Sequence, residues 1–250
     1  MAKHLFLIGF IFFFFSACSK SKNAVIAKIP EASGICYNQS SDTLLVANDE
    51  GSVYEISTEG KILRQKKLGD YDLEGVACDD KNNRLYFAAE ESGTVLVVSY
   101  ENLKVIQTIN VAQSLKGLIV LQDKKHGLEG IAVKNGSLYL AKQSKQRDPG
   151  DTPSVVVKID GLFNDQTPIS KRIDPQHSDI SGLAIDKTFL YMVSDKQNCL
   201  IRYDLAKDKV LSVKKLPVFA QEGVAFDSKG YIYFADDKGE VRKYPRRDFE

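Results

Sequence analysis

Acidic residues stand before a glycine at intervals along the chain. A short phrase, Ser or Glu followed by Gly and then Ile, Val or Leu, occurs five times, and its first residue is a glutamate in three of them. If folding brings these phrases together, several carboxylates share one place, and their mutual repulsion requires protons or a cation. Clustered carboxylate oxygens suit Ca²⁺, whereas zinc prefers nitrogen and sulfur ligands. The five phrases begin at Ser33, Glu74, Glu129, Ser181 and Glu222.

The spacing of the phrases indicates a repeat. Each phrase opens a unit of short segments rich in β-branched and aromatic residues, with turn residues between them. Four-stranded units of this length are typical of a β-propeller. The sequence therefore predicts an all-β, five-bladed β-propeller of four-stranded antiparallel blades, with six blades as the alternative if 112–125 holds further strands. The intervals of 41, 55, 52 and 41 residues separate Gly34, Gly75, Gly130, Gly182 and Gly223.

The fifth unit lacks a fourth strand. After the segment 240–244 only residues 245–250 remain, whereas the extended-looking segment 24–29 ahead of the first unit has no partner. We expect this N-terminal segment to complete the last blade, because pairing removes exposed strand edges and closes the ring. Residues 24–250 are thus predicted to form a single propeller domain.

Propeller geometry predicts where the acidic residues meet. The first strand of a blade lies nearest the axis and the second runs antiparallel beside it, so the start of the first and the end of the second share one face. We therefore expect these positions to surround one mouth of the central channel and to bind a cation, with Ca²⁺ as the expected ion. The alternative is that the carboxylates cap turns and face solvent. The predicted metal ligands are Glu74, Glu129, Glu222, Asp195, Asp237, Glu90 and Asp49. Three further carboxylates stand two residues ahead of a phrase, at Glu31, Asp72 and Asp179.

Two insertions are expected to emerge at the same mouth. One covers 142–153, and the other covers 112–125 and is followed by His126, a candidate catalytic residue. Long loops on a rigid scaffold commonly carry binding residues, and basic side chains there can hold an anionic ligand beside a metal. The first lysine of the insertion can instead neutralise Glu90 or Glu129, and a solvated loop is the other alternative. The predicted ligand-binding residues are Lys142, Lys145 and Arg147.

The N-terminus has the features of a leader. A basic start is followed by an apolar run over 5–15, which is too short for a permanent transmembrane helix. The residues 15–18 (FSAC) resemble a bacterial lipobox, in which the cysteine is acylated and becomes the mature N-terminus. We predict a lipoprotein signal peptide over 1–17, lipid attachment at Cys18 and a tether over 18–23, with an ordinary secretory leader as the alternative. The expected location is the cell envelope, periplasmic or surface-facing, in a bacterial membrane.

Composition limits the partners. The chain has 34 basic and 33 acidic residues, so it has no overall field that would favour nucleic acid, and no nucleic-acid partner is expected.

Beyond the leader, an odd number of cysteines argues against a disulfide framework. Cys36, Cys78 and Cys199 are therefore predicted to be packing residues, with a Cys36–Cys78 bridge as the alternative.

The repeated phrases resemble those of a known family. The stretches 72–77 (DLEGVA), 126–132 (HGLEGIA) and 179–184 (DISGLA) are similar to the SdiA-regulated (YjiK/CarP-like) family of exported bacterial β-propellers. The resemblance covers residues 24–245. It implies a propeller, an envelope location and a link to calcium and to phytase-like proteins, with no firmly attached reaction. The residues that match the family's repeated phrase are Glu74, Glu129 and Glu222, with Ser33 and Ser181 as polar variants.

Two functions are consistent with this sequence. In the first, the protein is a lipid-anchored binding or scaffold module whose mouth holds a cation and a small polar ligand or a protein partner. In the second, it is a calcium-dependent hydrolase of phosphate esters or lactones. There Glu129 would act as the general base, with His126 as a further candidate, and Lys142 or Arg147 would hold the anion. We favour the first, because fold alone licenses no chemistry.

Overall fold

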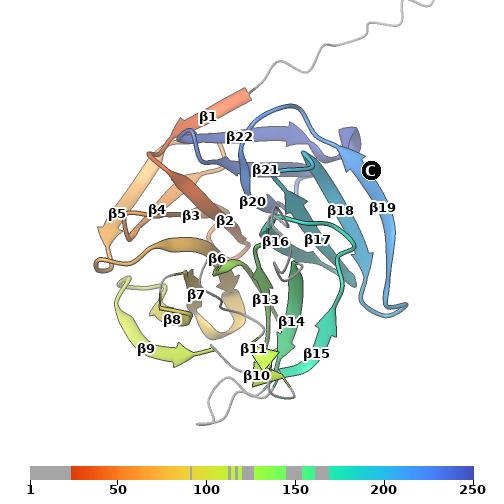
Figure 1. The fold of residues 1–250 in the computed structure, drawn as a ribbon. Helices are drawn as coiled ribbons and strands as arrows, with labels where there is room; N and C mark the ends of the chain where they lie inside the picture. Colours follow the sequence, from red (N-terminus) through yellow and green to blue (C-terminus); the bar gives the residue numbers. More distant parts are fainter. Residues whose placement is uncertain are drawn as a thin grey trace, which may run out of the picture.

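The computed structural model describes residues 24–90, 92–111, 114–115, 118–119, 127–144, 154–160 and 169–250. Five four-stranded antiparallel sheets surround a central axis (Figure 1), so the five-bladed prediction is confirmed. In the 112–125 stretch, which motivated the six-bladed alternative, the described residues form a two-stranded ribbon of β10 (Ser114–Leu115) and β11 (Leu118–Ile119).

The blades are numbered in chain order. Blade one contains β2 (Ala32–Asn38), β3 (Thr43–Asn48), β4 (Ser52–Ser57) and β5 (Ile62–Lys67). Blade two contains β6 (Leu73–Asp79), β7 (Arg84–Ala89), β8 (Thr94–Ser99) and β9 (Val105–Asn110). Blade three contains β12 (Leu128–Lys134), β13 (Ser137–Lys142), β14 (Val155–Ile159) and β15 (Ile169–Ile173). Blade four contains β16 (Ile180–Asp186), β17 (Phe189–Ser194), β18 (Cys199–Asp204) and β19 (Lys209–Lys215). Blade five contains β20 (Gln221–Phe226), β21 (Tyr231–Asp236), β22 (Glu240–Pro245) and β1 (Ala24–Lys28). Two short 3₁₀ helices are η1 (Asp80–Asn82) and η2 (Arg246–Asp248).

The N-terminal strand closes the ring, as predicted. β1 pairs antiparallel with β22, from Ala24 opposite Lys243 to Lys28 opposite Glu240. Figure 1 shows β1 at the outer edge of blade five, beside the last strand of the chain. This pairing joins the two ends of the described chain in one sheet, which removes the free edge that β22 would otherwise expose.

The hydrophobic core lies between the blades. In β3 every residue is buried, and alternate side chains enter different clusters: Leu44 and Val46 pack against blade five, whereas Leu45 and Ala47 pack against blade two. Alternation along a strand sends successive side chains to opposite faces, so a middle strand buries both of its faces. Each fully buried Leu or Val contributes about 1.5–3 kcal/mol by this burial. The outermost β5 alternates between half-buried and exposed residues, because only its inner face meets the blade stack.

The phrase glycines allow the innermost strands to meet around the axis. A Cβ atom at Gly34 would lie 2.6 Å from the Cα of Gly75, and one at Gly75 would lie 2.5 Å from the carbonyl oxygen of Glu129. On the other side of the ring, a Cβ at Gly182 would lie 2.6 Å from the carbonyl oxygen of Glu222. These distances are shorter than any side chain tolerates, so glycine is required by the close approach of neighbouring backbones.

One cysteine prediction is wrong. Cys36 and Cys78 form a disulfide between β2 and β6, the innermost strands of adjacent blades, with their Cα atoms 5.8 Å apart. The odd count misled, because two cysteines occupy comparable places in consecutive repeats and meet across the blade interface. Cys199 is free and buried, as predicted for a packing residue.

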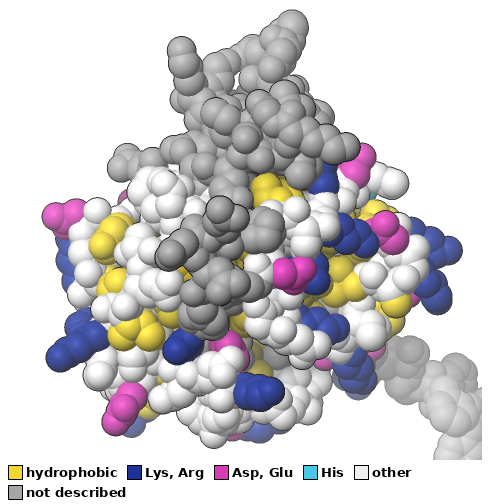
Figure 2. All heavy atoms as spheres, turned by 90° about the horizontal axis from the view of Figure 1, so that it is seen from below, with side chains coloured by type: hydrophobic (Ala, Val, Ile, Leu, Met, Phe, Trp, Pro, Cys, Tyr) yellow, Lys and Arg dark blue, Asp and Glu magenta, His cyan; other side chains and the backbone are white. Residues whose placement is uncertain are grey.

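The outer surface carries charges of both signs. On the side of the ring drawn in Figure 2, Lys and Arg side chains are interspersed with Asp and Glu, and neither sign gathers into one patch. Within the described ranges, the chain contains no helix with the length and hydropathy needed to cross a membrane.

Candidate functional site

Each phrase coincides with an irregularity in its blade. The pairing between first and second strands slips once per blade, at the residues just before or around the phrase glycine. In blade two, for example, the shift falls between Leu73 and Gly75 and leaves Glu74 outside the regular register. A β-bulge of this kind bends the strand and re-aims the extra side chain. The five bulges therefore place the phrase residues at equivalent positions around the axis.

The two phrase serines link neighbouring blades. The hydroxyl of Ser181 donates to the carbonyl oxygen of Gln221 at 2.6 Å, and the hydroxyl of Ser33 donates to the carbonyl oxygen of Leu73. Both serines are buried. In each case the acceptor lies two residues before the phrase glycine of the next blade. The serines thus fasten blade one to blade two and blade four to blade five, and they add no charge to the mouth.

Three carboxylates of blade two lie close together. Asp72, Glu74 and Glu90 each offer one oxygen, and these three atoms all lie within 4.8 Å of one another. Two oxygens on opposite sides of a Ca²⁺ ion bound at 2.3–2.6 Å are about 4.6–5.2 Å apart, so one such ion is compatible with all three groups. We call these residues, together with Glu129 and Glu222, the acidic mouth.

Backbone geometry holds Glu90 in place. Its backbone N–H donates to the carbonyl oxygen of Asp72 at 3.0 Å, and its Oε1 accepts the backbone N–H of Gly127 at 3.0 Å. A Cβ atom at Gly127 would lie 2.1 Å from the Glu90 Cγ. Where blades one, two and four carry an acidic residue two positions ahead of the phrase, blade three carries this glycine, which makes room for the Glu90 side chain.

Burial and mutual repulsion raise the proton affinity of the mouth. Glu129 is only 5% exposed, and burial raises its pKa well above the ordinary value, with Glu74, Glu90 and Glu222 raising it further. Burial likewise raises the pKa of Glu74, with Asp72, Glu90 and Glu222 adding to the effect. Glu74, Glu129 and Glu222, predicted to share one mouth, therefore interact electrostatically, although they come from three different blades.

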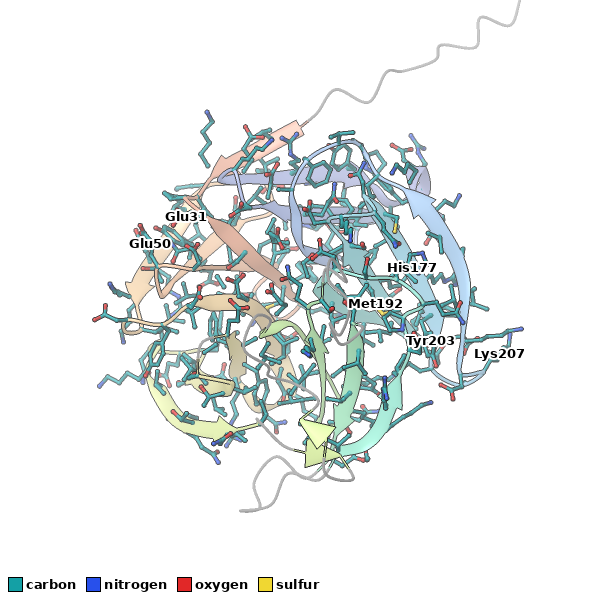
Figure 3. All side chains as sticks on the ribbon, in the orientation of Figure 1. Glu31, Glu50, His177, Met192, Tyr203 and Lys207 are labelled. Atoms are coloured by element: carbon teal, nitrogen blue, oxygen red, sulfur yellow. A yellow bond between two sulfur atoms is a disulfide. The ribbon has the colours of Figure 1, made fainter. Side chains whose placement is uncertain are left out.

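The acidic region extends toward blades one and five. Burial raises the pKa of Asp49 to about 7, helped by a hydrogen bond and charge from Glu31 and by the charges of Asp72 and Asp237. The backbone N–H of Asp49 also donates to the Glu31 carbonyl oxygen at 3.4 Å. Figure 3 shows Glu31 and Glu50 on the blade-one side of the ring. Asp237 itself is exposed, so it lies at the rim of the mouth.

The carboxylates near blade four bind backbone groups. Asp195 Oδ1 accepts the backbone N–H of Gln221 at 3.2 Å. Asp179 is 1% exposed and has a positive φ of 59°, and its Oδ2 accepts the N–H of Lys196 at 2.9 Å. The other oxygen of Asp179 is buried and accepts no hydrogen bond from the described residues. The negative charge of Asp179 helps to raise the pKa of Glu129, so Asp179 belongs to the same acidic region.

Of the predicted ligand-binding residues and His126, the structure describes Lys142 alone. Lys142 is 1% exposed, and its backbone pairs with Leu128, the residue before Glu129. His177 lies on the blade-four side in Figure 3, and its Nδ1 is 2.9 Å from the carbonyl oxygen of Pro175 in its own turn. Lys145, Arg147, His126 and Cys18 lie outside the described residues.

Asp72 and Asp179 were noted in the sequence but not included among the predicted ligands. The signal that identifies them is their position two residues ahead of a phrase, which the bulge brings to the same mouth.

The end of the channel away from the acidic mouth was missed altogether, although the residues four positions after each phrase glycine (Asn38, Asp79, Lys134, Asp186 and Asp227) are polar in every blade.

Comparisons with known proteins agree with the fold. A model of the SdiA-regulated family matches residues 19–237. A glutaminyl cyclase from Myxococcus xanthus superposes with a TM-score of 0.66 at 14% identity, covering 89% of this chain and 93% of that one. The Cps50 (Swd1) β-propeller domain from Myceliophteria thermophila aligns with a TM-score of 0.49 at 9% identity, over 86% and 97% of the two chains. No curated protein matches the sequence significantly. At 14% identity the likeness to the cyclase concerns the fold alone.

Proposed function

This chain belongs to the SdiA-regulated family of β-propellers, and from that premise we propose that it is an envelope binding module whose acidic mouth holds a Ca²⁺ ion. The observation that supports this best is the approach of one oxygen each from Asp72, Glu74 and Glu90 to within 4.8 Å. Carboxylate oxygens with room for six to eight ligands are what Ca²⁺ prefers. Water and neighbouring carboxylates would complete the coordination.

Electrostatics gives the reason for a cation. Glu74 and Glu129 are pushed toward their protonated forms by burial and by each other, so an empty mouth holds protons that a divalent ion displaces. The affinity for the ion therefore rises with pH as these groups lose their protons.

A bound cation would also favour ligands that carry a negatively charged group. Ca²⁺ at the rim of a channel keeps coordination positions open toward solvent, and these accept a carboxylate or phosphate of a small polar ligand or of a protein partner. We do not extend the proposal to hydrolysis, because fold alone licenses no chemistry.

We further propose export and lipid attachment at Cys18. The leader composition and the family support export, and the Cys36–Cys78 disulfide supports it independently, because disulfides persist in oxidising compartments and are rare in the cytosol. Growth with an alkyne-tagged fatty acid tests the anchor: wild-type protein should become labelled, whereas a Cys18→Ala variant should not. Equal labelling of both proteins, or of neither, contradicts the anchor.

Calcium titration tests the main proposal. Purified protein, first treated with EDTA, should show heat on calorimetric titration and a higher Tm in millimolar Ca²⁺. Glu74→Gln should abolish both responses, whereas the control Glu59→Gln, an exposed carboxylate with a side chain 73% exposed, should leave them unchanged. The proposal is contradicted if wild-type protein gives neither heat nor a thermal shift, or if both variants bind equally well.

A further inference from the structure

A second site lies at the end of the channel opposite the acidic mouth. A cavity of about 480 Å³ is formed there by the ends of the innermost strands and the turns that follow them. This volume is in the range of small-molecule sites, about 300–1,000 Å³. Its floor consists of the apolar residues after the phrase glycines, and the Cys36–Cys78 disulfide is part of its wall. The floor residues are Ile35, Val76, Ile131, Leu183 and Val224.

The cavity is separate from the acidic mouth. The five floor residues are each at most 4% exposed, and together with the phrase glycines and Glu222 they surround only about 10 Å³ of free space on the axis. That space holds about one water molecule at most. An ion or ligand at one end of the channel therefore has no direct contact with the other end.

The wall of the cavity combines apolar surface with Asp80, a carboxylate that forms no ion pair with the described residues. Asp80, at the start of η1, uses its Oδ2 to accept the backbone N–H of Gln39 at 2.8 Å, which fixes the carboxylate between blades one and two. The backbone N–H of Ser40 also donates toward this carboxylate, so its partners are backbone groups and not a basic side chain of the described residues. A half-buried carboxylate without a cationic partner is unfavourable, and a ligand that carries a positive charge would stabilise it.

The other acidic groups of the lining are engaged. Asp227 accepts two backbone N–H groups and the hydroxyl of Tyr233 at 2.8 Å. Asp186 lies 2.7 Å from the guanidinium of Arg246, which also donates to the Tyr191 hydroxyl. The ionisable residues of the lining other than Tyr37 are three acidic (Asp80, Asp186, Asp227) and two basic (Lys187, Arg246), a formal charge of −3 + 2 = −1.

We propose that this cavity binds a small organic amine, with its ammonium group on the Asp80 carboxylate and its apolar body on the floor of the cavity. An ammonium group donates a charge-assisted hydrogen bond to the carboxylate and matches the negative charge of the lining. Tyr37 also lines the cavity and can pack against an apolar or aromatic body.

Three matched probes test the charge of the ligand. 2-Phenylethylamine, 2-phenylethanol and 3-phenylpropionate share a phenyl ring and differ in being cationic, neutral and anionic. Calorimetric titration of the purified protein should show binding of the amine, weaker binding of the alcohol and no binding of the acid. Binding of none of the three, or binding of the acid as tightly as the amine, overturns the proposal, and preference for the alcohol would point to a hydroxylated ligand and also overturn it.

Variants locate the ammonium group. Asp80→Asn keeps an oxygen that can accept the Gln39 N–H but turns the other atom into a donor, so amine affinity should fall by about tenfold or more. The control Asp70→Asn changes an exposed carboxylate on the loop before β6 and should have no effect. Unchanged amine binding in Asp80→Asn contradicts the assignment.

Two further measurements keep the test independent of folding and of the cation proposal. In wild-type protein, NMR contacts should connect the ring protons of the amine to the methyl groups of Ile131 and Leu183, and contacts to other methyl groups only would place the ligand elsewhere. Glu74→Gln and saturating Ca²⁺ should leave amine binding unchanged. If either weakens it, the amine binds at the acidic mouth instead.

Discussion

The two ends of the channel are built from the same five strands but differ in chemistry. At the acidic mouth the strands are bulged, and the re-aimed positions carry Glu74, Glu129 and Glu222. At the opposite end the strands run in regular register into their turns and surround a cavity closed by a disulfide and apolar side chains. Backbone irregularity thus coincides with concentrated charge, and the apolar floor between the ends separates the acidic mouth from the cavity.

A large effect is expected from filling the close contact between blades two and three at the axis. Gly75→Ala would place a Cβ atom 2.5 Å from the carbonyl oxygen of Glu129, so blades two and three must move apart. Overpacking destabilises by about 1–3 kcal/mol, and a clash with backbone should cost about the top of that range, which urea unfolding should show.

A glycine elsewhere serves as the control. Gly136 has a φ of +76° but open space around its Cβ position, so Gly136→Ala should cost only about 1–2 kcal/mol, from the left-handed backbone alone. If the two alanine variants are equally stable, close packing at the axis does not hold the ring together.

Removing the disulfide should weaken the cavity end and spare the acidic mouth. The bridge closes a loop with a sequence separation of 42, and the chain-entropy relation then gives about 4 kcal/mol. A Cys36→Ser/Cys78→Ser variant should unfold at a correspondingly lower urea concentration but bind Ca²⁺ unchanged. Loss of Ca²⁺ binding in a folded variant would show that the two ends are not separate.

Neutralising the acidic mouth should stabilise the protein when no cation is present. In a Glu74→Gln/Glu129→Gln variant the burial of a charge and the repulsion between charges, which raise the pKa of both groups, are absent. At neutral pH with EDTA, Tm should rise, and each 1 kcal/mol gained corresponds to about 2–4 °C for a domain of this size. With Ca²⁺ the order should reverse, because only the wild-type protein gains from the ion. A lower Tm of the variant in EDTA contradicts this account.

A smaller effect is expected from pH at the blade-one side of the mouth. The pKa of Asp49 is about 7 in the folded protein against an ordinary 3.8, so the folded state holds this proton more tightly than the unfolded state. Its contribution to stability is present below the ordinary value and is lost as pH rises toward 7. In EDTA, Asp49→Asn should match the wild-type Tm near about pH 4 and exceed it near about pH 8.

The matched control for this pH effect is Asp70→Asn. The pKa of Asp70 is lowered, chiefly by its hydrogen bond with Lys67, so a gain in relative Tm at high pH is not expected for this variant. A constant difference between the wild type and Asp49→Asn across this pH range would show that Asp49 titrates normally.

Much of the fold could be predicted, because propeller repeats leave a periodic signal. The five phrases and the segment before the first one were sufficient to predict the blades and the closing strand. The disulfide could not be distinguished from packing, since contact between Cys36 and Cys78 depends on the rotation from one blade to the next. The grouping of Asp72 with Glu74 and Glu90 depends on a bulge and on Gly127, neither of which has a sequence signal strong enough to place side chains.

The most direct test of the account is a crystal structure with a cation that scatters anomalously. Crystals grown with Mn²⁺ in place of Ca²⁺ should show an anomalous peak between the carboxylates of Asp72, Glu74 and Glu90, and the peak should be absent in Glu74→Gln. A map without a peak at the acidic mouth, or with its strongest peak in the cavity at the other end, would contradict the claim that the bulged end of the channel is the cation site.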